Sequence, residues 1–286
     1  MITWPSPAKL NLFLYINGQY NDGYHQLQTL IGFLSYWDTI TIIPNNSGII
    51  TLYSSLKEIP TEQNLIFRAG KLLKQYAIKK KLLSPNQGAE ITLIKRLPIG
   101  GGLGGGSSNA ATTLIALNYL WNIHLSLDDL TILGLQLGCD IPVFVNGYAA
   151  FVEGLGEKLQ PIQLPEKWYL ILEPNIKIST ALIFQDPELK RNTPIRTLKE
   201  LYATPFSNDC EWVVRKRYQE IEKVFDYLSK YELKSRLTGT GSCVFCEFDN
   251  KITAYKILKQ VSKWIHAFIA QILNISPLHS LYSKIR

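Results

Sequence analysis

The stretch Leu97-Pro-Ile-Gly-Gly-Gly-Leu-Gly-Gly-Gly-Ser-Ser-Asn-Ala110 has six glycines within the seven positions 100–106. A β-rich run at 89–95 precedes it, and apolar residues at helical spacing follow it over 110–121. A glycine-rich loop between a strand and a helix can turn its amide groups toward an anion, and the helix N-terminus adds a partial positive charge. We therefore expect a phosphate-binding loop here and not a flexible linker, which would lack the flanking strand and helix.

Two common nucleotide motifs do not fit this loop. Residues 100–105 match the pattern GxGxxG, but the next helix is followed by a second helix instead of a strand that ends in an acid. A Walker A loop requires Lys before its Ser or Thr, and Gly106 occupies that position. The residues predicted to bind the phosphates are Pro98, Gly100, Gly101, Gly102, Leu103, Gly104, Gly105, Gly106, Ser107 and Ser108. The two serines are also expected to cap the helix or to contact a phosphate or its magnesium ion.

The bulk composition indicates a folded protein with anionic partners. The chain has 286 residues, enough for two domains, and is 46% hydrophobic and 19% charged, which excludes disorder and a coiled coil. The formal net charge is +7 and the pI about 9.1, which favours nucleotides, phosphates or nucleic acid as partners. The basic residues are scattered, and the densest cluster, Lys79 to Lys81, sits at the end of a predicted helix. We therefore expect no nucleic-acid partner.

Cysteine usage and hydropathy predict a cytoplasmic protein without a membrane partner. The four cysteines are too few for a disulfide framework, and Cys243 and Cys246 lie in an apolar segment that we interpret as a buried strand and not as a zinc or redox site. No basic stretch followed by an apolar run comes after Met1, and no window approaches 18 apolar residues.

Periodicity predicts alternating strands and helices. Residues 8–16 alternate as a strand with Lys9, Asn11 and Phe13 on one face and Leu10, Leu12 and Leu14 on the other. Further elements are expected as a polar turn (19–26), a strand (38–44), its hairpin partner (45–56), helices (64–76 and from 126), a hairpin (148–160), a strand (168–172), two or three helices (197–231), a strand (242–248) and a helix (255–261). This order predicts an α+β fold, and we place a boundary between domains 1–160 and 161–286.

Three segments resemble the three motifs of the GHMP kinases, in the same order: Pro-Ser-Pro-Ala-Lys-Leu-Asn-Leu at 5–12, the glycine-rich loop, and Leu-Thr-Gly-Thr-Gly-Ser at 237–242. Supporting segments lie at 22–25, 138–144 and 206–211, and the resemblance spans nearly the whole chain. It implies an N-terminal domain like the second domain of ribosomal protein S5, a ferredoxin-like C-terminal domain, and a small-molecule kinase that binds ATP and its substrate between them. The branch that it resembles most phosphorylates an alcohol that carries a cytidine diphosphate group.

Phosphoryl transfer needs a positioned hydroxyl, a group to manage its proton and positive charge on the phosphoryl group. Asp140 precedes a predicted helix among small and apolar neighbours, where a carboxylate should remain ionised, and the resemblance implies that it is the catalytic base. Lys9 would hold Asp140 ionised and stabilise the developing charge. Asn11, on the same strand face, is expected to bind the accepting hydroxyl or orient Lys9.

The resemblance also implies binding residues around the base and the phosphates. Tyr24 and His25 are expected to grip the cytidine, with Phe184 as the second face of a sandwich and Thr180 beside it. Gly239, Thr240 and Gly241 form an amide-rich turn suited to a phosphate, and Asn64 is an adenine contact or a helix cap. The spacing of Asp186, Asp209 and Glu211 predicts no metal site, and Mg²⁺ is expected to arrive with ATP.

Two other functions remain open from the residues. A kinase of this kind could act on homoserine, mevalonate or a sugar, which need no aromatic sandwich. A nucleic-acid-binding module would explain the basic pI, but the sequence shows no face on which basic and aromatic residues cluster. The oligomeric state is also left open.

Overall fold

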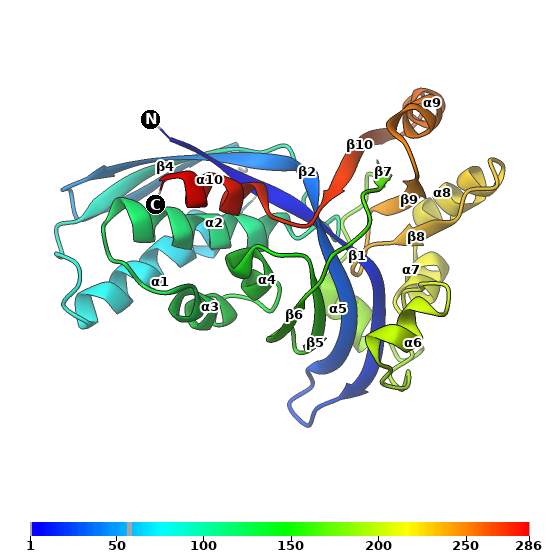
Figure 1. The fold of residues 1–286 in the computed structure, drawn as a ribbon, viewed down its shortest axis with the longest axis horizontal. Coiled ribbons are helices and arrows are strands. Elements are labelled where there is room, and N and C mark those ends of the chain that lie inside the picture. Colours follow the sequence, from blue (N-terminus) through cyan, green and yellow to red (C-terminus); the bar gives the residue numbers. More distant parts are fainter. Residues whose placement is uncertain (1, 56–58, 286) are drawn as a thin grey trace.

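A ten-stranded sheet runs through the molecule in the computed structural model, which describes residues 2–55 and 59–285 (Figure 1). Its main path has the order β3-β4-β2-β10-β7-β9-β8, and β1 and β5 both pair with β2. The strands are β1 (Thr3–Gln19), β2 (His25–Asn45), β3 (Ile50–Ser54), β4 (Gly88–Ile94), β5 (Ala150–Gly154), β6 (Lys158–Pro161), β7 (Trp168–Glu173), β8 (Ser235–Leu237), β9 (Val244–Phe248) and β10 (His266–Leu273).

Ten α-helices and one 3₁₀ helix are described within these residues. They are η1 (Thr61–Gln63), α1 (Leu65–Lys79), α2 (Gly105–Leu120), α3 (Leu127–Leu135), α4 (Ile141–Asn146), α5 (Thr180–Gln185), α6 (Leu198–Tyr202), α7 (Glu211–Arg217), α8 (Gln219–Ser229), α9 (Lys251–Val261) and α10 (Pro277–Ile285). Helix α3 begins after Ser126, where a helix was predicted to start, and Ser126 and Asp129 form a capping box by exchanging side-chain and backbone hydrogen bonds. The predicted α+β class is confirmed.

The first two strands form a long antiparallel hairpin, and a bulge in β1 changes which way its side chains face. The register with β2 shifts between Asn11 and Leu14. Lys9 and Asn11 share a face as expected, because their side chains touch. Phe13, however, joins the core cluster of Leu10, whereas Leu14 faces the same cavity as Lys9. The predicted alternation was therefore wrong beyond the bulge, because one extra residue moves every later side chain to the other face.

Strand β3 is not the hairpin partner of β2 that the sequence predicted. It pairs in parallel with β4, with Ile50 opposite Ala89, and β4 itself occupies the place beside β2. Helix α1 supplies the crossover that a parallel pair requires. Residue 56 of the predicted partner lies outside the described residues. The polar turn is also shorter than expected, because β2 already begins at His25.

The second half of the chain has ferredoxin-like topology, as the resemblance implied. Strands β10, β7, β9 and β8 form an antiparallel sheet in this order, with α7 and α8 before β8 and α9 between β9 and β10. Three helices lie between residues 197 and 231, as predicted. Helix α5, strands β8 and β10 and helix α10 were not predicted, because short or mixed apolar runs carry little periodicity.

Helix α10 returns to the first half of the molecule. Leu278 belongs to the same core cluster as Trp4, and Leu281 and Tyr282 pack against this cluster. The two ends of the chain accordingly lie on the same side of the molecule (Figure 1). Division of the chain between residues 160 and 161 stays a prediction.

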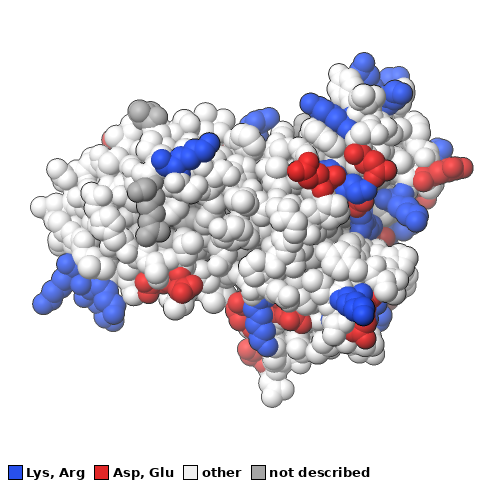
Figure 2. All heavy atoms as spheres, viewed as in Figure 1, with Lys and Arg blue, Asp and Glu red and all other residues white. Residues whose placement is uncertain are grey.

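The surface charges, the cysteines and the helix lengths concern nucleic-acid binding, zinc or redox chemistry, and membrane insertion, none of which the sequence predicted. On the face seen in Figure 2, basic and acidic side chains are interspersed over the C-terminal half, and basic side chains gather near the end of α1. Cys243 and Cys246 are buried in clusters on opposite faces of the sheet, which confirms the buried strand. Burial raises the pKa of the Cys246 thiol to about 12. None of the described helices has the length and apolar character needed to span a membrane.

Candidate active site

A cavity of about 1020 Å³ lies where the glycine-rich loop meets β1, the start of α4, helix α5 and the turn before β9. It brings together most residues singled out in the sequence: Lys9, Asn11, Tyr24, His25, Asn64, Pro98, Gly100, Gly101, Gly102, Leu103, Gly104, Gly105, Gly106, Ser107, Asp140, Thr180, Phe184, Gly239 and Thr240. Ser108 and Gly241 are not among the lining residues. Segments from both halves of the chain therefore build one site.

The glycine-rich loop turns its carbonyl groups toward the protein. The carbonyl oxygens of Gly100 and Gly101 accept hydrogen bonds from the amides of Ser242 and Cys243, and that of Gly102 accepts one from the Thr238 hydroxyl. The next two carbonyls, of Leu103 and Gly104, accept from the amides of Lys9 and Ser108. Five successive carbonyls are thus satisfied within the protein. This arrangement suits a loop whose amide groups serve an anion.

Helix α2 begins directly on this loop, and its first turn has no capping side chain. The N-cap is Gly104, with φ of 69°, and no side chain bonds the first amides. Helix capping by Ser107 and Ser108 was therefore a wrong expectation. The first amides of a helix have no partner within it, so they remain available to a ligand. Ser107 lines the cavity, but Ser108 is fully buried and its hydroxyl bonds that of Ser6.

Close packing between the loop and the turn before β9 requires glycine at one position. A Cβ on Gly102 would lie 2.1 Å from the carbonyl oxygen of Thr238, and the φ of Gly102 is 74°. By contrast, a Cβ on Gly100 would meet nothing within 4 Å. The two glycine motifs therefore support each other, and the backbone of Thr238 leaves no room for a side chain at Gly102.

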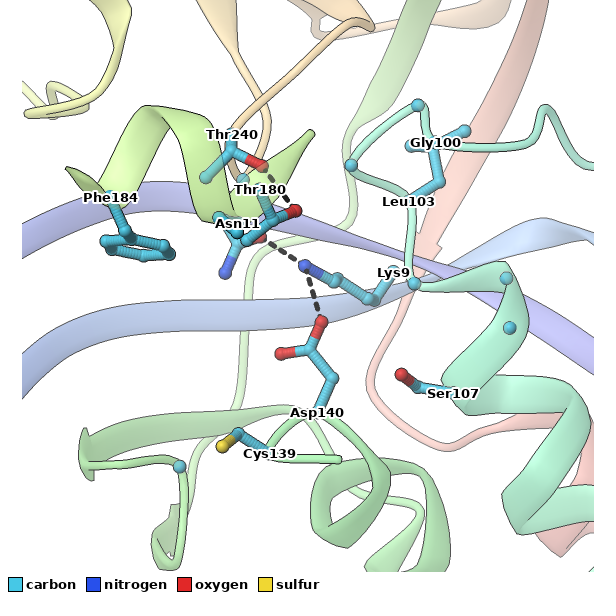
Figure 3. A pocket seen from close by; sticks show the side chains of 18 of the residues that line it. Lys9, Asn11, Gly100, Leu103, Ser107, Cys139, Asp140, Thr180, Phe184 and Thr240 are labelled. Atoms are coloured by element: carbon cyan, nitrogen blue, oxygen red, sulfur yellow. Dashed lines mark hydrogen bonds and ion pairs between the residues drawn. The ribbon is translucent and has the colours of Figure 1, made fainter. Parts of the chain in front are cut away.

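The side chains of Lys9 and Asp140 point toward each other and form an ion pair in the cavity (Figure 3). The distance from Lys9 Nζ to Asp140 Oδ2 is 3.4 Å, and the side chain of Lys9 is 4% exposed whereas that of Asp140 is 44% exposed. Asp140 occupies the N-cap position of α4, yet its side chain makes no capping bond, so helix capping does not explain it. In such a pair the accessible carboxylate can accept a proton, and the buried cation can stabilise negative charge that develops beside it.

The amide of Asn11 is held in one orientation by its neighbours. The Thr29 hydroxyl donates to the carbonyl oxygen of Phe13, so its lone pair accepts from Asn11 Nδ2 at 2.9 Å. Asn11 Oδ1 then faces Lys9 Nζ, from which it accepts a hydrogen bond. The backbone amide of Asn11 donates to the Thr238 hydroxyl at 3.1 Å. Thr29 and Thr238, which were not among the predicted site residues, thus hold Asn11 in place.

The other end of the cavity carries aromatic side chains. His25 is buried and its ring stacks on that of Phe184, with centroids 4.8 Å apart and an interplanar angle of 26°. A base can therefore stack on Phe184 only at its other face. Tyr24 follows the turn at 20–23 and is 57% exposed. Burial, together with the charge of Arg191, lowers the pKa of His25.

Three of the smaller predictions have clear structural positions. The hydroxyl of Thr180, in the first turn of α5, lies 2.9 Å from that of Thr240, which joins α5 to the turn before β9 (Figure 3). The Asn64 side chain caps α1 by accepting from the amide of Ile66. Gly241 follows Thr240 but does not line the cavity.

A buried ion pair behind the loop was also missed. Lys95 Nζ lies 2.5 Å from Asp38 Oδ2, and Asp38 further accepts from the amides of Arg96 and Leu97. Desolvation lowers the pKa of Lys95, and the carboxylate of Asp38 opposes this effect. Lys95 also lines the cavity near Gly105. Because the two partners lie 57 positions apart, no local pattern connects them.

The acids of the C-terminal half have structural partners. Asp209 accepts from the amide of Ile16 and from the Thr193 hydroxyl, Glu211 accepts from the amide of Leu237, and Asp186 pairs with Arg217. Over 2–55 and 59–285, no group of three or more His, Cys, Asp or Glu side chains is arranged to hold a metal ion.

Two family models match the chain. The model of the GHMP kinases N terminal domain covers residues 64–148, and that of the GHMP kinases C terminal domain covers residues 189–267. Together they span more than half of the chain. The first contains the glycine-rich loop and Asp140, and the second contains the turn at 238–241.

Solved structures of the same fold include kinases with different acceptors. A 4-(cytidine 5'-diphospho)-2C-methyl-D-erythritol kinase is 29% identical, with a TM-score of 0.79 over 95% of this chain and 99% of that chain. A homoserine kinase from Cytophaga hutchinsonii is 17% identical, with a TM-score of 0.63 over 96% and 94%. A Streptococcus pneumoniae phosphomevalonate kinase in complex with phosphomevalonate and AMPPNP is 14% identical, with a TM-score of 0.60 over 95% and 100%. The last two share the fold alone.

Proposed function

The chain belongs to the GHMP kinases, which are ATP-dependent kinases of small molecules, and on that premise we propose that it phosphorylates the 2-hydroxyl of 4-diphosphocytidyl-2-C-methyl-D-erythritol. This reaction belongs to non-mevalonate isoprenoid precursor biosynthesis. The observation that carries the proposal is the shape of the site. A phosphate loop and a Lys–Asp pair share one cavity with an aromatic end wall that suits a nucleobase.

In the proposed reaction the hydroxyl oxygen forms a bond to the γ-phosphorus of ATP, and the bond from this phosphorus to the bridging oxygen of ADP breaks. The hydroxyl proton goes to the carboxylate of Asp140, which is accessible from the cavity. Lys9 supplies positive charge to the oxygen that loses the proton, and Asn11 keeps Lys9 in place. The amides of the loop and of the first turn of α2 bind the phosphates.

The site fits an ATP-bound Mg²⁺ better than a resident ion. A resident ion would need carboxylate ligands, and Asp140, the acid among the proposed catalytic residues, already pairs with Lys9. Ser107 at the first turn of α2 is the cavity-lining side chain that would contact Mg²⁺ or its waters. Bound there, the ion would neutralise charge on the phosphates.

The test is an ADP-release assay with ATP, Mg²⁺ and the cytidine-bearing acceptor, run beside the same alcohol without its cytidine group. We expect turnover only with the cytidine group, because stacking at the aromatic wall supplies the binding energy. Asp140→Asn should lower kcat by about 10²- to 10⁴-fold, which is what a general base contributes. Asp249→Asn, a change to an exposed acid that pairs with Lys167, is the matched control.

Equal turnover of the cytidine-free alcohol would contradict the acceptor and favour a kinase for a smaller alcohol. Full activity in Asp140→Asn would contradict the assignment of the base.

A further inference from the structure

Arg191 connects the two parts of the aromatic wall that are far apart in the sequence. It lies in the segment 186–197 between α5 and α6, which we call the strap. Its Nε donates to His25 Nε2 at 3.1 Å, and its Nη2 donates to the carbonyl oxygens of Phe184 and Asp186 at 2.7 and 2.8 Å. A fourth bond runs from Nη1 to the carbonyl oxygen of Leu189 at 3.0 Å. One guanidinium thus holds β2, α5 and the strap together.

Helix α5 depends on this support more than a longer helix would. It spans only Thr180–Gln185, and the last carbonyls of any helix lack partners within it. A cation that bonds these carbonyls also interacts favourably with the helix dipole. Because Phe184 lies in the last turn of α5, the position of its ring depends on the bonds from Arg191.

The same guanidinium selects one tautomer of His25. All nitrogens of an arginine side chain donate and none accepts, so His25 Nε2 must be the unprotonated nitrogen. The ring proton of neutral His25 is then on Nδ1. Among the described residues, no side chain or carbonyl group accepts a hydrogen bond from Nδ1, so this N–H can donate to the nucleobase of the acceptor. Burial and the neighbouring guanidinium both lower the pKa of His25, which favours this neutral form.

The strap itself is fastened to the β1–β2 hairpin. The amide of Thr193 donates to the carbonyl oxygen of Ile16, and the Thr193 hydroxyl donates to Asp209. The buried Gln28 side chain accepts from the amide of Arg196 at 3.1 Å and donates to its carbonyl oxygen at 2.8 Å. The strap that carries Arg191 is therefore fixed to the hairpin and is not a free loop.

We propose that Arg191 is a positioning residue for binding of the acceptor's nucleobase, because its guanidinium fixes the ring of His25 and the last turn of α5 in one arrangement. This role rests on the proposed function, since it concerns binding of the cytidine group. Arg191 does not line the cavity, so it acts through His25 and Phe184.

The decisive variant is Arg191→Met, which keeps the length of the side chain and removes all donors. We expect the KM for the cytidine-bearing acceptor to rise by about 10- to 100-fold, as the loss of charge-assisted hydrogen bonds predicts. The kcat and the KM for ATP should change little. Arg191→Lys keeps the charge but has a single nitrogen, so we expect an intermediate rise in KM. Arg215→Met is the matched control, because Arg215 makes a similar forked bond, to Glu222, away from the cavity.

A proportional rise of both KM values, or a loss shared with Arg215→Met, would show a merely structural role and overturn the proposal. The ¹⁵N NMR spectrum of the wild-type protein gives a readout that does not need turnover, with His25→Gln to assign the signal. We expect a protonated Nδ1 and a bare Nε2, and a proton on Nε2 would overturn the proposal. If the wild type does not use the cytidine-bearing acceptor, the proposed function fails, whereas the NMR result still decides whether Arg191 holds His25.

Discussion

The two ends of the cavity differ in the groups that line them: backbone groups at one end and side chains at the other. The nucleotide end consists of backbone: five successive carbonyls of the glycine-rich loop bond to neighbouring segments, and the helix that follows has no capping side chain. The aromatic end consists of the side chains of His25 and Phe184, which stack on each other, and Arg191 holds both residues from outside the cavity. Backbone amides suit the binding of phosphates, whereas side chains suit the selection of one acceptor. The comparison leads us to expect that the nucleotide end tolerates few changes and that the aromatic end sets specificity for the acceptor.

The largest effect should come from adding one methyl group at the nucleotide end. In Gly102→Ala the new Cβ would collide with the Thr238 carbonyl, and the positive φ adds strain. We expect kcat/KM for ATP to fall by at least about a hundredfold, because small displacements of a phosphate site are costly.

Gly100→Ala provides the comparison for this variant. It has the same kind of backbone strain but open space around the new methyl group, so we expect a loss within about tenfold and a destabilisation of about 1 kcal/mol. Steady-state kinetics and urea unfolding measure both variants. Equal behaviour of the two variants would mean that the loop does not need its contact with the turn before β9.

A smaller effect is expected where a side chain orients the catalytic pair. Thr29→Val keeps the shape of the side chain but removes the hydroxyl that fixes the Asn11 amide. We expect kcat at saturating ATP and acceptor to fall by about tenfold, as the loss of a buried hydrogen bond predicts. Thr29→Ser retains the hydroxyl and should stay close to the wild type. An unchanged kcat in Thr29→Val would show that the Asn11 amide does not need the Thr29 hydroxyl to keep its orientation.

The smallest effect concerns the pH dependence of stability at the aromatic end. Folding lowers the pKa of His25 from about 6.5, so the unfolded chain takes up a proton more readily as the pH falls. The stabilisation is complete above about pH 6.5 and is lost as the pH falls through the pKa of the folded state. Urea unfolding between about pH 7 and about pH 5 should therefore show a weaker pH dependence in His25→Gln than in the wild type. His279, whose pKa burial also lowers, is kept in both proteins. An identical pH dependence would contradict the prediction.

The same contrast explains what the sequence could predict. The glycine-rich loop, the helix after it and the cap at Ser126 are local patterns, so their positions were predictable. The pairing of Arg191 with His25 spans 166 positions and that of Asn11 with Thr238 spans 227, so only the folded sheet brings these residues together. The bulge in β1 and the parallel pairing of β3 with β4 belong to strand pairing in the folded sheet, which propensity does not encode.

Helix α10 gives the molecule an order of assembly. Leu278 completes a core that also contains Trp4 and residues of α2, so this core has an open side until residues 277–285 have left the ribosome. The ferredoxin-like sheet faces the same constraint, because β10 pairs with both β7 and β2. Domains usually fold in the order in which they are synthesised. Here the core around Trp4 and the sheet of the second half are completed by α10 and β10, two elements that follow most of the residues they pack against.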